Sequence, residues 1–165
     1  MIRRLSLAGL LIVLSVFSGC GSGILTPSHH ITEEYNEAFA AASSGDLVTL
    51  QTYVANDHAI LGATEWDGRT LLHDAVDKGR QNVAKYLLDQ GANIDGVTQD
   101  GRTAIHMAAQ HGDIPMITLL LRYKAKINPV DGKGWTPLDR AEKWGHADAV
   151  SFLRGRGGQE GASLR

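Results

Sequence analysis

The side chains best suited to chemistry in this sequence are one cysteine and a few histidines. Cys20 is the only cysteine, which rules out an intramolecular disulfide and a CxxC metal site. His73 and His106 stand 33 residues apart, and His29 and His30 are adjacent in a Gly, Ser and Pro segment, where solvated histidines are more typical than metal ligands. The sequence lacks the HExxH, GxSxG and helix-opening GxGxxG motifs of metalloproteases, hydrolases and dinucleotide enzymes. It therefore predicts no catalytic centre, cofactor or metal site.

The spacing of the two histidines belongs to an internal repeat. Residues 67–99 and 100–132 align over 33 positions with 12 identities, whereas unrelated segments would share roughly two or three. A third step gives residues 133–158. Thr70, Thr103 and Thr136 share one column of this alignment, and Gly79, Gly112 and Gly145 share another. The chain is therefore expected to stack similar units rather than to build one irregular core.

Each unit carries the signals of a turn followed by two helices, as the middle unit illustrates. Asp100 and Gly101 supply turn chemistry, and Thr103 can cap a helix by accepting a backbone N–H. Ala108 lets neighbouring helices approach closely, and Gly112 ends the first helix. Apolar residues at helical spacing then predict a second helix in every unit: Val83, Tyr86 and Leu87; Met116, Leu119 and Leu120; Ala149, Phe152 and Leu153.

These units resemble ankyrin repeats, whose pattern includes Thr-Pro-Leu-His near the start of the first helix. The corresponding stretches read TLLH at 70–73, TAIH at 103–106 and TPLD at 136–139, and the resemblance covers about residues 65–158. It implies an all-α repeat fold, an ankyrin-type solenoid of helix pairs with β-turn fingers. It also implies that His73 and His106 bond loop backbone rather than act in catalysis.

The two ends of the array depart from the repeat, as terminal units of a solenoid do. Residues 32–66 are interpreted as a degenerate N-terminal capping repeat, and residues 133–158 as a C-terminal capping repeat. In the C-terminal capping repeat, Arg140 and Glu142 occupy the positions that Met107 and Ala109 hold in the middle unit. This substitution predicts a polar face toward water. Residues 159–165 are predicted to be a disordered tail.

Lys124 is a departure inside the array. It occupies the column of Gly91 and Gly157 after the second helix. If the backbone is left-handed there, a non-glycine residue costs about 1 kcal/mol.

The N-terminus has the pattern of an export signal. Arg3 and Arg4 precede an apolar run from 5 to 17, and Cys20 follows directly after "VFSG". This resembles the lipobox of bacterial lipoproteins, with Phe17 in place of the usual Leu. The resemblance implies a signal peptide over 1–19, a lipidated Cys20 and a flexible tether over 20–31. Because Gly21 stands where Asp would resemble an inner-membrane retention signal, it also implies the periplasmic side of the outer membrane. The alternative is an ordinary secretory signal with a chance cysteine.

The columns that the repeat leaves free are the candidate partner-binding residues, because ankyrin repeats bind proteins through their fingers and first helices. The candidates are Trp66, Asp67, Arg69, Asp77, Lys78, Gln99, Asp100, Arg102, Gln110, His111, Lys133, Trp135, Lys143 and Trp144. All three tryptophans fall among them, and tryptophan often dominates interface energetics when a partner buries it. The alternatives are that Trp144 merely covers the end of the stack and that Trp66 packs on the loop before it.

The hypothesis from sequence is a membrane-tethered periplasmic module that binds and inhibits or protects a partner protein, for example an immunity protein against a toxic effector enzyme. The alternatives are a scaffold or stabiliser of a resident periplasmic enzyme or envelope assembly and, more remotely, an enzyme. A formal net charge of −2 and the lack of a basic stripe argue against nucleic acid as a partner. Polar end caps favour a monomer.

Overall fold

The computed structural model describes residues 35–164. The predicted signal peptide, lipidated Cys20, tether and first three residues of the N-terminal capping repeat lie outside the described residues, as does Arg165. Within the described part, no helix is both long and apolar enough to span a bilayer.

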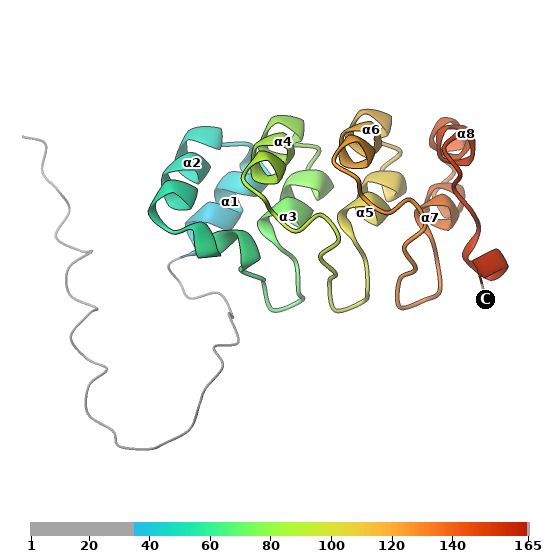
Figure 1. Cartoon of the computed structure of the whole chain (residues 1–165), viewed down its shortest axis with the longest axis horizontal. Helices are drawn as coiled ribbons and strands as arrows, with labels where there is room; N and C mark the ends of the chain where they lie inside the picture. The colour runs from blue at the N-terminus through green and yellow to red at the C-terminus, as the bar shows by residue number, and fades with distance from the viewer. Residues whose placement is uncertain (1–34, 165) are drawn as a thin grey trace, which may run out of the picture.

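The described chain is a single row of four helix pairs, which confirms the predicted all-α solenoid (Figure 1). The α-helices are α1 (Asn36–Ser44), α2 (Leu47–Asn56), α3 (Leu71–Asp77), α4 (Gln81–Asp89), α5 (Ala104–Gln110), α6 (Ile114–Arg122), α7 (Pro137–Lys143) and α8 (Ala147–Gly155). Two short 3-10 helices, η3 (His58–Gly62) and η4 (Gly161–Leu164), follow α2 and α8. Helices α1, α3, α5 and α7 form an inner row, and α2, α4, α6 and α8 form an outer row (Figure 1).

The start of each inner helix after the first is fixed by a threonine and the side chain three residues later. The Thr70 backbone N–H donates to His73 Nδ1 at 3.2 Å, and the Thr103 N–H donates to His106 Nδ1 at 3.2 Å. In α7 the Thr136 N–H donates instead to Asp139 Oδ2 at 2.7 Å. These bonds satisfy N–H groups that the helix itself leaves unpaired. In the opposite direction, the His73 N–H donates to the Thr70 hydroxyl at 3.4 Å and the Asp139 N–H donates to the Thr136 hydroxyl at 3.3 Å. Helix α5 has the same capping box at Thr103, so the predicted threonine caps are confirmed.

The predicted glycine stops are also confirmed. Gly79, Gly112 and Gly145 follow the inner helices with φ of 65°, 67° and 75°, a left-handed conformation that glycine adopts at little cost. Lys124 adopts φ 68° after α6, and it is the one residue other than glycine with a positive φ in the described chain. Its backbone is thus left-handed, as the sequence comparison with Gly91 and Gly157 suggests.

Both rows contribute buried apolar residues to the core. In the inner row Ala75, Ala108 and Ala141 are all 0% exposed, on helices that contact their neighbours along the row. In the outer row Leu87 and Leu120 are also 0% exposed, and each contributes about 1.5–3 kcal/mol by burial. The core is therefore a continuous layer between the two rows.

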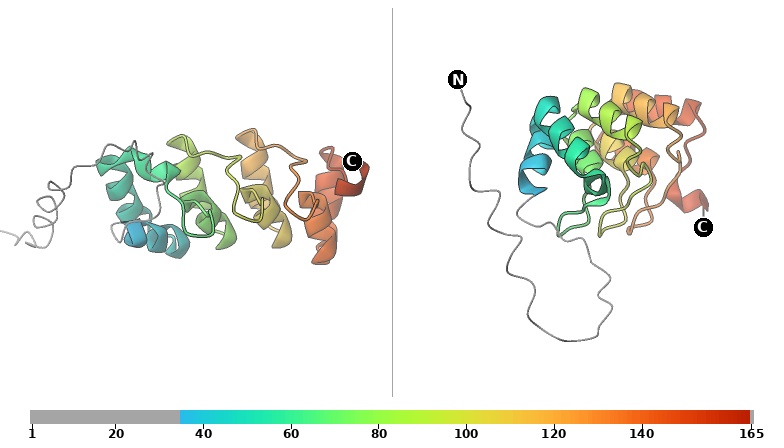
Figure 2. Two further views of the ribbon diagram at one scale, coloured as in Figure 1. Left: turned by 90° about the horizontal axis from the view of Figure 1, so that it is seen from below. Right: turned by 60° about the vertical axis from the view of Figure 1, so that its left-hand side comes forward.

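The connection from each outer helix to the next inner helix makes a tight turn, called here a finger. The finger turns span residues 65–68, 98–101 and 131–134, and each is closed by a backbone bond of 2.9 Å between its end residues. Neighbouring fingers are joined, since Gln99 N–H donates to the Asp67 carbonyl at 2.8 Å and Gly132 N–H donates to the Asp100 carbonyl at 2.9 Å. Figure 2 shows the three fingers side by side along the stack.

A glycine is required in the middle finger on two counts. Gly101 has φ 75°, and a Cβ placed on it would lie 2.8 Å from the backbone nitrogen of Gly132. A larger residue would therefore strain its own backbone and separate two fingers.

The prediction of a disordered tail from residue 159 is wrong for residues 161–164, which form η4 against the last finger. Gly161 is buried, and its N–H donates to Asp139 Oδ2 at 2.8 Å. The Thr136 hydroxyl donates to the Gln159 carbonyl at 2.7 Å. Sequence patterns do not signal this docking, because Gly161 carries no side chain and its partner lies 22 residues earlier.

The tail also gives a physical reason for Asp139 in a column that holds His73 and His106. His106 Nε2 lies 3.0 Å from the Trp135 carbonyl of the following finger and donates to it. After the third finger the tail takes the place of a further finger and presents the N–H of Gly161. The donor His106 of the preceding unit is thus replaced by an acceptor in the last unit, which matches the group that each side chain meets.

Candidate partner-binding surface

The candidate residues gather on one side of the solenoid, called here the inner face. It consists of the fingers and the C-terminal ends of α3, α5 and α7. Side-chain contacts connect the two parts: Arg69 of the first finger pairs with Asp77 at the end of α3 at 3.2 Å, and His111 of the next unit reaches the same Asp77 at 3.0 Å. The 33-residue period therefore brings candidate residues that are distant in the sequence into one surface.

In the first unit of the inner face, the charges are paired internally. Arg69 Nη2 lies 2.8 Å from Asp74 Oδ1, while Asp77 accepts from Arg69, Lys78 and His111. Burial opposes ionisation of Asp77, but these three donors outweigh it and lower its pKa to about 2. Arg69 therefore forms ion pairs with two carboxylates, those of Asp74 and Asp77.

Asp74 is a buried member of this cluster that the sequence reasoning missed. Its side chain is 11% exposed. Burial raises the pKa of Asp74 to about 6; Arg69 opposes the shift, and the charges of Glu65 and Asp77 add to it. The alignment of the units does single out Asp74, because it is a carboxylate in a column that holds Met107 and Arg140 in the later units.

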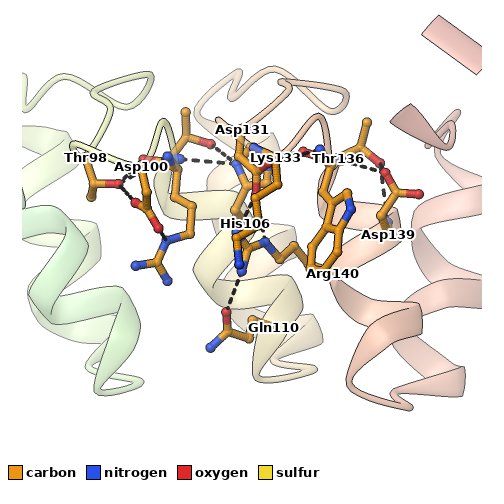
Figure 3. Close-up of polar contacts among 12 residues, drawn as sticks. Thr98, Asp100, His106, Gln110, Asp131, Lys133, Thr136, Asp139 and Arg140 are labelled. Atoms are coloured by element: carbon orange, nitrogen blue, oxygen red, sulfur yellow. Dashed lines mark hydrogen bonds and ion pairs between the residues drawn. The ribbon is translucent and has the colours of Figure 1, made fainter. Parts of the chain in front are cut away.

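The middle unit is likewise paired. Arg102 Nε lies 2.6 Å from Asp100 Oδ2, and the Thr98 hydroxyl donates to the same carboxylate (Figure 3). Burial opposes ionisation of Asp100, and these two donors hold its pKa below the usual range. Gln99 Nε2 donates to the Trp66 carbonyl, so its side chain ties the second finger to the first.

The prediction that Arg140 faces water is wrong. Arg140 is 6% exposed, and its Nε donates to Asp131 Oδ2 at 2.9 Å while Nη1 donates to Gln110 Oε1 at 3.2 Å (Figure 3). Asp131 Oδ1 accepts the backbone N–H groups of Lys133 at 2.8 Å and Trp135 at 3.0 Å. Burial opposes ionisation of Asp131, but the N–H of Trp135 and the guanidinium lower its pKa. A buried acceptor thus draws the arginine inward, whereas Glu142 remains exposed.

The three tryptophans have different environments. Trp66 is 78% exposed on the first finger and Trp144 is 57% exposed just after α7. Most of both side chains therefore faces solvent, so neither is used mainly as packing for this chain. Trp135 is half-buried, with Lys133 Nζ 5.4 Å and the Arg140 guanidinium carbon 5.2 Å from its ring centre.

The two buried histidines have structural positions. His73 is 1% and His106 is 0% exposed. Because His106 Nδ1 accepts the Thr103 N–H, its proton resides on Nε2, which bonds the next finger. Burial lowers the pKa of both imidazoles, that of His73 to about 4, so both are neutral near pH 7. Within residues 35–164 no group of three or more His, Cys, Asp or Glu is arranged to hold a metal ion.

Comparison with known proteins supports the repeat assignment. Residues 72–121 match the family model described as "Ankyrin repeats (many copies)". No curated protein matches the chain. The match covers the two middle helix pairs, and the flanking pairs continue the same stacking. Residues 72–121 are therefore similar to ankyrin repeats, and the described chain folds as an ankyrin-type solenoid, an architecture typical of protein–protein interaction modules.

Proposed function

We propose that this chain is a membrane-tethered periplasmic protein that captures a partner protein on its inner face. The observation that carries the proposal is the exposure of Trp66 and Trp144, at 78% and 57%, on the inner face. Tryptophan offers a large apolar area and an N–H donor, and it is enriched among the residues that dominate binding energy. Burial by a partner would remove this apolar area from water.

The internal pairing of the face supports a rigid binding mode. Arg69, Asp77, Arg102 and Arg140 are each held by partners of the same chain before any ligand arrives. Binding to a preorganised surface loses less side-chain entropy, which favours tight inhibition or protection of a partner. An immunity protein that blocks a toxic effector enzyme is one role of this kind. We also propose that the chain captures its partner as a monomer.

The capture experiment uses the full-length chain, purified in detergent and immobilised. Wild type is expected to retain a discrete partner from envelope extract, whereas Trp66→Ala combined with Trp144→Ala should lose it. Val48→Ala is the matched control, since Val48 is 74% exposed on α2 of the outer row. Trp135 is left intact because it stacks with Arg140, and its removal would also disturb the fold. If the folded double variant captures the same partner in undiminished yield, the inner face is not the binding surface.

The tether rests on the lipobox-like sequence around Cys20. Dual or triple acylation anchors a soluble domain firmly, whereas a single chain holds it only marginally. Cys20→Ser is expected to leave an unprocessed precursor without incorporated fatty acid, measured by gel mobility and metabolic labelling. Normal maturation of this variant would refute lipidation and leave a secreted protein.

A further inference from the structure

The same four columns of the inner face carry different charges in the first and last units. The first unit has Asp67, Arg69, Asp77 and Lys78, and the last has Lys133, Trp135, Lys143 and Trp144. In the first unit both cations are paired: Arg69 lies 2.8 Å from the Asp74 carboxylate, and Lys78 lies 3.2 Å from the Asp77 carboxylate. In the last unit these columns hold no carboxylate at all, so its cations depend on other residues for neutralisation.

The two lysines of the last unit have no such neutralisation. Lys133 and Lys143 are exposed, and no ion pair among residues 35–164 includes either one. Two nearby carboxylates are already engaged, since Asp131 is paired with Arg140 and Glu142 lies 2.5 Å from Arg154 Nη2. Lys133 instead lies over the Trp135 ring. Positive charge is therefore left unbalanced beside two tryptophans.

Helix α7 places these groups on one face. Trp135 precedes the helix and contacts Arg140, and Trp144 follows Arg140 by four residues, one helical turn along the same side. The seven residues of α7 correspond to roughly 10 Å of helix rise. An extended segment of about three residues covers that length, at roughly 3.3 Å per residue.

We infer that the partner presents an acidic segment, with carboxylates and one or more apolar side chains, along this face of α7. The inference deepens the proposed function and rests on it. Carboxylates would neutralise Lys133 and Lys143, while apolar side chains would cover Trp135 and Trp144. A nucleic acid is the less suitable polyanion, because two lysines on this face of a chain with net charge −2 do not form a phosphate-binding stripe.

The test uses defined polymers in place of the unknown partner. Fluorescein-labelled random copolymers of glutamate and tyrosine, and of lysine and tyrosine, are titrated with the full-length chain in detergent, alongside oligothymidylate. Fluorescence anisotropy is measured at low and high salt. Wild type should bind the glutamate copolymer in preference to the other two, and more weakly at high salt.

The discriminating variant is Lys133→Glu with Lys143→Glu. Each reversal turns an attraction into a repulsion, so Kd for the glutamate copolymer should rise by about tenfold or more. The matched control is Arg122→Glu with Lys124→Glu, which changes the net charge equally at two exposed residues that enter no ion pair in the described chain. It should change Kd by less than about twofold.

Several results would overturn the inference: no binding of the glutamate copolymer, preference for the lysine copolymer, equally tight binding of oligothymidylate, or equal loss in both charge-reversed variants. Failure here is distinguishable from failure of the proposed function. If the lysine-reversed variant still captures the envelope partner that the Trp66 and Trp144 variant loses, the acidic segment is refuted and the inner face stands. If the tryptophan variant also retains that partner, the proposed function itself fails.

Discussion

The buried pair of Arg140 and Asp131 can be tested with a substitution that the chain already contains. In the preceding unit the same two columns hold Met107 and Thr98, which are 2% and 5% exposed. Arg140→Met alone removes the cation, whereas Arg140→Met with Asp131→Thr transplants the packing of the neighbouring unit. We expect the single variant to be strongly destabilised and the double variant to recover most of the loss.

The magnitude follows from burial. The side chains of Arg140 and Asp131 are 7% and 0% exposed, and Arg140 donates to Asp131 Oδ2 from two of its nitrogens. Removing one member of such a pair leaves a buried charge without a partner, which costs about 3–5 kcal/mol of unfolding free energy. A threonine at position 131 can instead accept the Trp135 N–H, as Thr98 accepts the Arg102 N–H at 3.1 Å. The double variant should therefore lie within about 1 kcal/mol of wild type.

The assay is urea unfolding followed by circular dichroism, with Asp131→Thr completing a double-mutant cycle. Because a terminal unit of a solenoid can unfold before the rest, hydrogen exchange of α7 and α8 is measured in parallel. A cost below about 1 kcal/mol for Arg140→Met by both measurements would refute the argument, since it would mean that Asp131 does not depend on its cation. A double variant less stable than Arg140→Met would refute the equivalence of the two units.

Three further predictions concern pH, backbone strain and the tail. His73 and His106 have pKa values lowered below the ordinary 6.5, so stability should be full above that pH and fall as the pH drops toward 4. Asp74 has a raised pKa, so the folded protein binds its proton more readily than the unfolded chain, and this opposes the loss of stability as the pH falls. Asp74→Asn removes that opposition and should make the loss steeper. Equal urea midpoints for the two proteins from pH 7 to 4 would contradict this prediction. Lys124→Gly should raise the unfolding free energy by up to about 1 kcal/mol by relieving the positive φ, whereas Lys124→Ala should not, as urea midpoints would show. Asp139→His should remove an acceptor used by η4 and speed amide exchange there by about tenfold or more; unchanged protection would show that the tail docks without it.

Much of the fold could be predicted because its signals are local. Thr103 caps a helix through a residue three positions away, and Gly112 leaves the helix through its own backbone preference. Each unit repeats these signals, so a departure such as Lys124 could be assigned a left-handed backbone by comparison with its column. Local signals of this kind depend little on how the units pack.

The candidate surface was less predictable, because the free columns show which residues vary but not what they contact. Exposure separated the tryptophans: Trp66 and Trp144 face solvent, whereas Trp135 is half-buried with two cations close to its ring. The partner-binding role of these columns stays a prediction, as do the repeat boundaries and the lipidation of Cys20.

By itself, the sequence determined the 33-residue period, the caps and turns and the class of solenoid, because these depend on contacts within a few residues and on backbone preferences. Only the tertiary structure decided the burial of Arg140, whose partners Asp131 and Gln110 lie 9 and 30 residues away. It also decided the docking of Gly161 on Asp139, 22 residues apart. Desolvation and charge pairing depend on which groups the folded chain brings together, and the order of residues along the chain does not state that.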